Sequence, residues 1–462
     1  MNKFILSFLY CFVFWTFTLN GQNQETDDAI FIKNIYNKVL QDGSAYQWLH
    51  HLTTKIGGRL SGSPQAAQAV TYTQSMLDSI GLDSVWLQPC EVPHWVRGEK
   101  EVVHIVSPSG NISLPALALG NSISTPTSGI TAEVIEVRSL DEVEKLGTEK
   151  IKGKIVFFNR PMDPTQIRTF NAYGGAVDQR VNGPSQAAKY GAVATLVRSM
   201  TTLLDDHPHT GVMANKEGVT KIPGIAISTN AAEMLSKMLL DKKVNVFIKT
   251  SCKTLPPVQS YNVIGEIRGS THPDEIILVG GHLDSWDVGQ GAHDDGAGCV
   301  HAMEVIRTLK ELNYQPKRTL RCVLFMNEEN GLGGGRAYAA EANKKGEKHL
   351  AAVESDAGGF TPRGFSCDAE NEVFADLYLK LQRWLPLLEP YGLMLTKGGS
   401  GADISPLKDQ KGLLVGFRPD SQRYFDYHHT ATDTFEAVNQ RELELGAAAI
   451  TALIYLIDKH GL

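Results

Sequence analysis

A histidine and several aspartates follow a short apolar run in the middle of the chain. The run covers residues 275–279, and His282, Asp284 and Asp294 come after it among several glycines. A short apolar run bounded by turn residues is typical of a buried strand, and glycine lets the backbone curve away at its end. Imidazole and carboxylate are ligands that suit a borderline divalent metal such as zinc. The stretch therefore predicts metal chemistry at the carboxyl end of a strand.

The same pattern recurs after three further apolar runs. Glu328 and Glu329 follow residues 319–326, Asp356 follows residues 349–353, and His429 comes after residues 413–417. In an open α/β sheet the carboxyl ends of the strands border one crevice, which is where ligands bind. Carboxylates that share a crevice repel one another unless a cation lies between them. Two histidines and three carboxylates are enough for two divalent ions that share one carboxylate, a site able to polarise a carbonyl or phosphoryl oxygen.

The segments that carry these residues alternate between strand and helix. Helical patterns cover residues 298–312, 332–343, 373–385 and 442–459, and the region 27–80 is also helical in pattern. Such alternation predicts an α/β fold with a mostly parallel central sheet and helices on both faces.

A second strand–helix pattern without a cluster of metal or catalytic side chains occupies residues 121–254. We interpret it as a smaller α/β domain inserted into a main domain formed by residues 25–120 and 255–462.

Composition limits the function. The chain has 462 residues and a formal net charge of -7, which does not favour binding to nucleic acid. Residues 1–21 have a positive start and an apolar stretch, typical of a secretory signal peptide, and this stretch is shorter than the roughly 20 residues that a membrane span needs. We expect a secreted or periplasmic protein without a membrane span after signal removal. Five cysteines would remain, so one or two disulfides are expected to be possible.

Taken together, the ordered motifs resemble those of the M28 family of co-catalytic zinc peptidases. The resemblance rests on residues 282–296, on residues 327–329 and 354–358, and on residues 427–434, and it extends over nearly all of the mature chain. It implies the zinc exopeptidase fold, and the inserted module resembles the protease-associated domain common in this family.

The resemblance also implies roles for individual residues and two zinc ions per chain. One zinc would be held by His282 and Asp356, the other by Glu329 and His429, with Asp294 bridging both. Glu328 would be the general base, and Asp284 would fix the tautomer of His282. The alternatives Asp295 for Asp294 and His428 for His429 stay open, because only family spacing separates them.

Other polar residues have weaker interpretations. Ser400, Gly401 and Asp403 lie in a glycine-rich loop that resembles the family's substrate-side loop, and an ordinary turn is the alternative; His428 is a further candidate for substrate binding. The histidines at 207, 209 and 293 lie in polar loops, where solvated histidine is the usual outcome.

The function implied is hydrolysis of short unblocked peptides, above all dipeptides, by a hydroxide that bridges two zinc ions. Carboxypeptidase or dipeptidase action is the first interpretation, and an aminopeptidase on the same metal centre is the second. A catalytically silent binding protein and an aminoacyl cyclase are further alternatives on this scaffold. The inserted module is expected either to restrict access to the cleft or to mediate contact in a homodimer.

Overall fold

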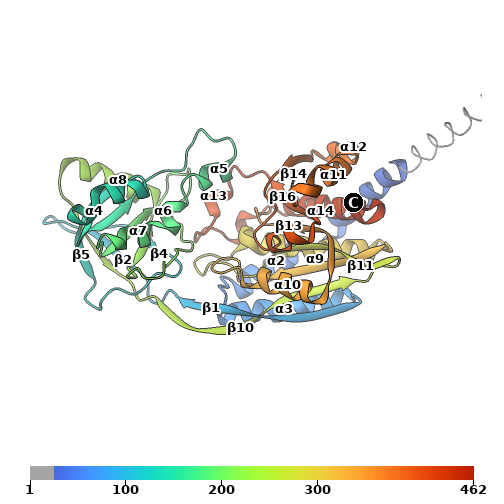
Figure 1. The fold of residues 1–462 in the computed structure, drawn as a ribbon, viewed down its shortest axis with the longest axis horizontal. Helices are drawn as coiled ribbons and strands as arrows, with labels where there is room; N and C mark the ends of the chain where they lie inside the picture. The colour runs from blue at the N-terminus through green and yellow to red at the C-terminus, as the bar shows by residue number, and fades with distance from the viewer. Residues whose placement is uncertain (1–24) are drawn as a thin grey trace, which may run out of the picture.

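The computed structural model describes residues 25–462, which form two bodies, each built on an eight-stranded sheet (Figure 1). The larger body holds the carboxyl terminus and lies on the right of the figure, while the smaller body lies on the left. The signal peptide predicted over residues 1–21 lies outside the described residues. Both sheets are covered by helices, so the predicted α/β class is confirmed.

The larger sheet is parallel at its centre and antiparallel at three of its outer joins. The four central strands are parallel, and the antiparallel joins are β1 to β10, β10 to β12 and β14 to β16. In spatial order the strands are β1 (Ser84–Val96), β10 (Lys253–Ile267), β12 (Arg318–Phe325), β11 (His272–His282), β13 (Lys348–Glu354), β16 (Leu413–Pro419), β14 (Pro362–Asp368) and β15 (Met394–Lys397). The predicted metal residues all follow the parallel central strands.

Both faces of this sheet are buried. Along β11, Ile277 and Val279 join one apolar cluster, while Leu278 between them joins a second cluster on the opposite face. This alternation follows from the two-residue period of a strand. The second face is covered by α10 (Gly333–Lys345) and η4 (Ser405–Gln410). The first face is covered by the helix over residues 25–42, α2 (Ala45–His51), η1 (Leu52–Ile56), α3 (Pro64–Ile80), α9 (Ala297–Glu311), α11 (Asn371–Gln382), α12 (Leu385–Leu388), η3 (Glu389–Tyr391) and α14 (Gln440–His460).

The smaller sheet lies between helices of its own. The helix α8 (Thr229–Asp241) packs on one face, and α4 (Leu140–Ile151) and α7 (Gly183–Lys189) pack on the other, close to α5 (Thr169–Gly174) and α6 (Asp178–Val181). In spatial order its strands are β3 (Ile112–Ser113), β2 (Val102–Val106), β9 (Asn245–Lys249), β5 (Ile130–Val137), β6 (Ile155–Phe158), β7 (Ala194–Arg198), β8 (Gly224–Ile227) and β4 (Ala116–Ala118).

The smaller sheet begins earlier in the chain than the predicted module boundary at residue 121. The chain leaves the larger sheet after β1 and re-enters it with β10, and β2, β3 and β4 already belong to the smaller sheet. All three strands are short, β3 pairs only with β2, and β2 and β4 join the rest of the sheet through β9 and β8, which follow much later, so the local pattern did not assign them to this sheet. The domain limits 25–120, 121–254 and 255–462 stay a prediction.

Cysteine and membrane expectations can be compared with the described residues. Within residues 25–462 all five cysteines are buried free thiols, so the expected disulfides do not form there. No helix in this part of the chain is long and apolar enough to cross a membrane.

Candidate metal centre

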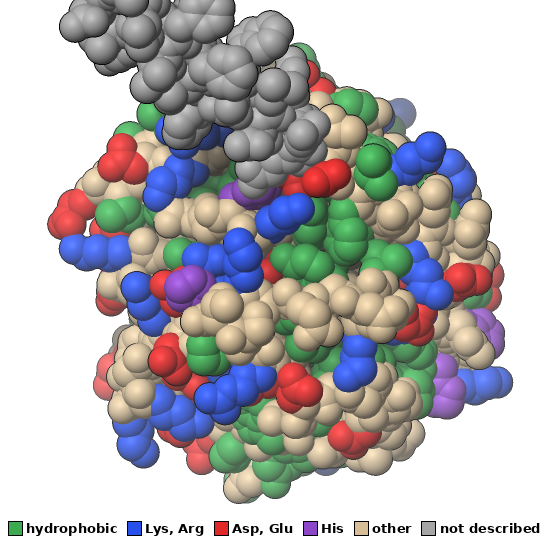
Figure 2. Space-filling view, turned by 90° about the vertical axis from the view of Figure 1, so that its right-hand side faces the viewer, with side chains coloured by type: hydrophobic (Ala, Val, Ile, Leu, Met, Phe, Trp, Pro, Cys, Tyr) green, Lys and Arg blue, Asp and Glu red, His purple; other side chains and the backbone are tan. Residues whose placement is uncertain are grey.

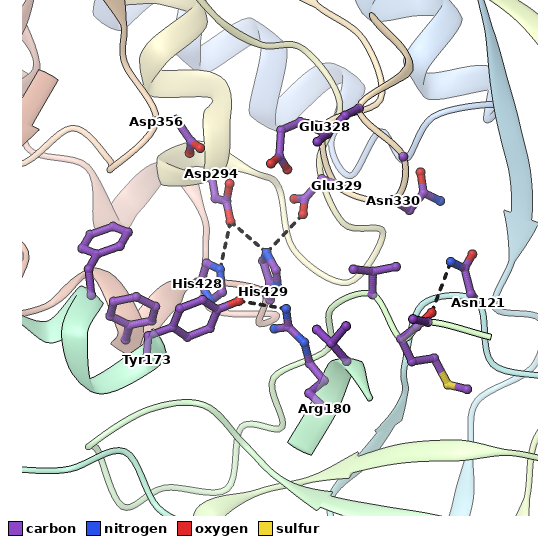
Figure 3. Close-up of a pocket in the computed structure, with 18 of the residues that line it drawn as sticks. Asn121, Tyr173, Arg180, Asp294, Glu328, Glu329, Asn330, Asp356, His428 and His429 are labelled. Atoms are coloured by element: carbon purple, nitrogen blue, oxygen red, sulfur yellow. Dashed lines mark hydrogen bonds and ion pairs between the residues drawn. The ribbon is translucent and has the colours of Figure 1, made fainter. Parts of the chain in front are cut away.

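The five predicted metal ligands converge at the carboxyl edge of the larger sheet. His282 is the last residue of β11, and Asp294 lies in the adjoining π-helical turn η2 (Ala292–Gly296). Glu329 follows β12 and Asp356 follows β13, while His429 comes just after the short helix α13 (Tyr424–Tyr427). Figure 3 shows Asp294, Glu329, Asp356 and His429 around one open space.

Two histidine-centred groups share Asp294. His282 Nε2 lies 3.2 Å from Asp294 Oδ1 and 3.6 Å from Asp356 Oδ1. On the other side, His429 Nε2 lies 3.2 Å from Asp294 Oδ2 and 3.1 Å from Glu329 Oε2. Ligand atoms ~2.0–2.1 Å from a tetrahedral zinc ion are about 3.3 Å apart. In both groups the distances from the histidine to its two carboxylates are close to this spacing.

The electrostatics of these residues also fit bound cations. Burial, together with the neighbouring Asp294 carboxylate, raises the pKa of Glu329 to about 7. Its Oε1 atom is buried, and no donor among the described residues reaches it. Burial among the same carboxylates also raises the pKa of Glu328 well above its usual value. A divalent ion bound among these carboxylates would remove this repulsion.

The two adjacent aspartates have different surroundings. Asp295 uses both carboxylate oxygens on backbone amides, those of His282 at 3.0 Å and Gly298 at 2.9 Å. Asp294 instead directs one oxygen toward each metal-facing histidine, and its own amide donates to Asp433 at 3.1 Å. The geometry favours Asp294 as the bridging ligand and gives Asp295 the task of holding the loop.

The two adjacent histidines differ in the same way. His429 Nε2 lies within 3.2 Å of two carboxylates, whereas His428 Nε2 lies 3.8 Å from the nearest of them, Asp294. The rings stack with centroids 3.5 Å apart. His428 also packs edge-on against Tyr173 and lines the cavity beside the cluster. Geometry favours His429 as a ligand and leaves His428 as part of the cavity wall.

Asp284 acts on two groups at once. Its main-chain carbonyl lies 3.0 Å from His282 Nδ1, whereas its carboxylate is 3.8 Å from that nitrogen. The carboxylate accepts the amides of Asn327 at 2.7 Å and Glu328 at 3.0 Å. Asp284 therefore orients the His282 ring through its backbone and fixes the turn that carries Glu328.

The loop at residues 400–403 packs against Glu354, the last residue of β13. Ser400 and Asp403 are buried, and a side chain at Gly401 would collide with the carboxylate of Glu354. Ser400, Gly401 and Asp403 are absent from the cavity lining among the described residues. Of the four candidates for substrate binding, the structure brings only His428 to the cavity.

Two histidines expected to be solvated are buried instead. His293 stacks on Phe360 with centroids 4.1 Å apart, and burial lowers its pKa to about 4. His209 Nδ1 lies 2.7 Å from the carbonyl oxygen of His428, and burial lowers its pKa to about 3. The prediction was wrong for these two because the larger body covers their polar loops; His207 is exposed as expected.

A cavity of about 700 Å³ opens beside the metal cluster, and both bodies line it. The larger body supplies Asp294, Glu328, Glu329, Asp356 and His429, while the smaller body supplies side chains such as Tyr173 and Arg180 (Figure 3). Phe170 of α5 stacks on Tyr424 of α13, and this pair forms part of the contact between the two bodies.

Sequence reasoning missed Arg59, which is fully buried under the metal loop. Its guanidinium donates to the carbonyl oxygens of Leu283 at 2.6 Å, Gln290 at 2.8 Å and Gly291 at 3.0 Å. It therefore holds the loop that connects His282 with Asp294. The sequence signal for a special role was its position in a glycine-rich loop, residues 57–63, because an arginine there belongs to neither a helix nor a strand.

Comparison with known proteins agrees with this geometry. The family model for peptidase family M28 matches residues 262–454. Carboxypeptidase Q of Bos taurus is 35% identical over 93% of this chain and 88% of its own length. The chain belongs to peptidase family M28. It is a zinc metallopeptidase, because the peptidases of this family use zinc and the cluster has the matching ligands.

Solved structures place the M28 chain in the zinc exopeptidase fold. An M28 peptidase precursor from Shewanella amazonensis superimposes with a TM-score of 0.88 at 34% identity, covering 94% of this chain and 97% of that one. A zinc aminopeptidase from Bacillus subtilis has a TM-score of 0.63 at 21% identity, covering 89% and 93% respectively, and it supports the fold alone.

Proposed function

We propose that this M28 peptidase is an exported di-zinc exopeptidase that hydrolyses short peptides with free ends, dipeptides above all. The observation that carries the proposal is the pair of histidine-centred ligand groups that share Asp294 at the edge of the cavity. His282 and Asp356 would hold one ion, Glu329 and His429 the other, and Asp294 both. Zinc at these positions would polarise the scissile carbonyl and lower the pKa of water to about 7.

Glu328 is the proposed general base. It lines the cavity beside the cluster, and its backbone amide is fixed by Asp284. In this position its carboxylate takes a proton from the attacking water and returns it to the amine of the leaving residue. Glu329, the next residue, turns to the His429 side, so the two neighbouring glutamates divide proton transfer and metal binding between them.

The size of the cavity supports a short substrate. A pocket of about 700 Å³ is within the usual range for sites that enclose small ligands. The smaller body forms the wall opposite the metal cluster, which limits how much peptide can extend beyond the scissile bond. This wall is also the reason to expect an exopeptidase rather than an endopeptidase.

Carboxypeptidase action is favoured over aminopeptidase action. The relative that is 35% identical carries the name carboxypeptidase Q, and this likeness extends over most of both chains. The same metal centre would also serve an aminopeptidase, and the difference lies in the charged terminus that the walls receive.

Export and assembly complete the proposal. The apolar segment within residues 1–21 supports cleavage of a signal peptide and release as a secreted or periplasmic protein. A homodimer is a further prediction, and light scattering on the purified mature chain measures it directly.

The test of the proposed function is a substrate panel for the purified mature protein. Free dipeptides, N-blocked dipeptides and aminoacyl-anilides are compared, each with and without a chelator. Cleavage of free dipeptides alone, lost on chelation and regained with zinc, supports the proposal. Strong cleavage of anilides would make the protein an aminopeptidase, and no turnover with zinc bound would make it a silent member of the family.

A further inference from the structure

The smaller body takes part in the metal centre through the main chain of Thr210. The carbonyl oxygen of Thr210 lies 3.3 Å from Nδ1 of His429, and the amide of Thr210 donates to the carbonyl oxygen of His429 at 3.0 Å. A metal-binding histidine commonly donates its second ring nitrogen to such a carbonyl, which fixes the tautomer and the direction of the ring. This contact directs Nε2 of His429 toward Asp294 and Glu329.

The other metal-facing histidine is oriented within the larger body. Nδ1 of His282 lies 3.0 Å from the carbonyl oxygen of Asp284, which is only two residues further along the same loop. His429 differs also in its left-handed backbone, with a φ of 64°. This conformation is uncommon for a residue with a side chain and persists only where the surroundings hold it. The ligand group built on His429 therefore depends on the position of the smaller body.

Arg97 connects Thr210 with the loop that carries metal residues. Arg97 follows β1, where the chain leaves the larger sheet, and its side chain is 10% exposed. Its guanidinium binds both carboxylate oxygens of Asp287, with Nε donating to one at 2.9 Å and Nη2 to the other at 2.7 Å. Asp287 lies between His282 and Asp294 in the sequence, so this ion pair attaches Arg97 to the metal loop.

The guanidinium of Arg97 also contacts the smaller body. Nη1 donates to the carbonyl oxygen of Ala118 at 2.5 Å, and Nη2 donates to Oγ1 of Thr210 at 3.4 Å. The hydroxyl of Thr210 donates to the same carbonyl oxygen of Ala118 at 2.8 Å. Glu101 completes the group, accepting from Arg97 at 3.2 Å and from the amide of Ala118 at 2.7 Å. One side chain thus joins the metal loop to the segment that orients His429.

The covalent connection between the two bodies leaves room for movement. Within residues 25–462 the chain crosses between them after β1 and again before β10, and these long strands lead from the larger body toward the smaller one (Figure 1). Domains joined in this way move relative to one another unless the contacts between them are extensive. Arg97 lies at the first crossing, where a rotation of the smaller body would carry Thr210 away from His429.

We propose that Arg97 is a positioning residue of the metal centre. It docks the smaller body so that Thr210 orients His429. Binding of the zinc ion at the His429 group is thereby coupled to the docking of the smaller body. By linkage, binding of this ion favours the docked arrangement in turn. The inference rests on the proposed di-zinc site and adds the dependence of one ion on the second body.

The test measures the dissociation constants of both zinc ions, by competition with a chelator, for wild type, Arg97→Gln and Arg97→Lys. We expect Arg97→Gln to weaken binding of one ion roughly 10- to 100-fold, the usual effect of removing a partner that orients a metal ligand, and to leave the other unchanged. Arg97→Lys should keep part of the affinity, because it retains the charge but not the two parallel hydrogen bonds. A general loss of stability would weaken both ions.

Two further backgrounds identify the ion that is affected. In His429→Ala, which retains the His282 group, adding Arg97→Gln should not change the zinc affinity further. In His282→Ala, which retains the His429 group, the same addition should weaken zinc binding roughly 10- to 100-fold. Equal effects in both backgrounds would overturn the inference.

Small-angle X-ray scattering measures the docking itself. Zinc-free Arg97→Gln should have a larger radius of gyration than the same variant with saturating zinc, and the zinc-saturated variant should match wild type. A radius of gyration for Arg97→Gln that is the same with and without zinc would overturn the coupling.

Arg363 provides a matched control. It donates to Asp420 from Nε at 3.3 Å and from Nη2 at 2.8 Å, and both residues belong to the larger body. Charges of both signs are interspersed on the surface of this body (Figure 2), and exposed ion pairs contribute little to stability. Arg363→Gln should leave both zinc dissociation constants at their wild-type values. Weakening of one ion equal to that in Arg97→Gln would overturn the assignment to Arg97.

The outcomes separate this inference from the proposed function. If wild type does not bind two zinc ions, the proposed di-zinc site itself fails. If wild type binds two and Arg97→Gln binds both as tightly, only the role of Arg97 is overturned. If Arg97→Gln does not fold, Asp287→Asn decides, because it removes the same ion pair from the other side. Weaker binding of one ion in that variant supports the inference, and unchanged binding of both overturns it.

Discussion

The role proposed for Glu328 as general base can be tested without removing a proposed metal ligand, by replacing its carboxylate with an amide. In Glu328→Gln an amide replaces the carboxylate while the volume stays the same, so the turn fixed by Asp284 should persist. We expect normal zinc content and a loss in kcat of roughly 10²–10⁴-fold, the usual contribution of general-base catalysis. Zinc analysis and dipeptide kinetics on one preparation measure both quantities. Near-normal turnover would refute the assignment.

The neighbouring histidines offer a matched pair of variants. His429 Nε2 is 3.1 Å from Glu329 and 3.2 Å from Asp294, whereas His428 Nε2 is 3.8 Å from Asp294. We expect His429→Ala to lose about one zinc ion per chain and His428→Ala to keep both. Metal analysis after dialysis distinguishes the two variants. The opposite pattern would exchange their roles.

Motifs indicated which residues would lie together, whereas roles that depend on tertiary contact could not be predicted. The five predicted ligands lie together, because each follows a strand that ends at the same edge. The contacts of Arg180 with Tyr173 and Thr210 could not be predicted, since these residues come from separate stretches of chain. Burial of His293 and His209 likewise depends on the body that covers them.

At the scale of elements, the loop between β11 and η2 depends on one buried side chain. Arg59 donates to three carbonyl oxygens of this loop. Arg59→Met leaves these acceptors buried without donors, and each such group costs about 1–3 kcal/mol. We expect a loss of at least about 3 kcal/mol in the free energy of unfolding and weaker zinc binding. Urea unfolding tests this, with Arg336→Met as an exposed control; equal effects of the two variants would contradict it.

Asp28 links the helix over residues 25–42 to α14 through a hydrogen bond and two ion pairs. Its carboxylate accepts from Tyr455 at 2.7 Å and pairs with Lys459 at 2.9 Å and His460 at 2.8 Å. Burial opposes ionisation, but these partners outweigh it and lower the pKa of Asp28 below its usual value. Because the pKa is lower in the folded state, the stabilisation is complete above the unfolded pKa of about 3.9 and is lost as the pH falls through the folded value.

Asp28→Asn should therefore lower the free energy of unfolding by about 1–3 kcal/mol at neutral pH. The difference from wild type should shrink as the pH falls below about 4, where the wild-type carboxylate also becomes protonated. Urea unfolding of both proteins across this pH range measures it. A difference that is independent of pH would show that the charge of Asp28 is not what fastens the helix.

Element types were predictable from periodicity, and their partners were not. The helical pattern of residues 27–80 was predicted, and the structure has helices there, with a buried face at Ile32, Ile35 and Val39 and a start of α3 at Pro64. The antiparallel pairing of β10 with β12 and of β14 with β16 was not predicted. Alternation of strand and helix predicts parallel neighbours, and it does not apply where no helix separates two strands in the sequence. Packing across the sheet decides such joins.

For the whole molecule, the predicted α/β class is confirmed, but the smaller body has a larger role than expected. It was predicted to carry no catalytic cluster and either to restrict access to the cleft or to mediate contact in a homodimer. It does form the wall opposite the metal cluster, and through Thr210 it also contacts His429. The site therefore belongs to both bodies, which explains why motifs from the larger body alone describe only half of the cavity.

The measurement that tests the di-zinc peptidase most directly is a zinc titration of the chelator-stripped mature protein, followed by hydrolysis of a free dipeptide. We predict that turnover reaches its maximum at two zinc ions per chain, because two ligand groups share Asp294. Full turnover with one ion per chain would contradict the shared site. A folded protein that binds two ions and hydrolyses no peptide would contradict the peptidase function.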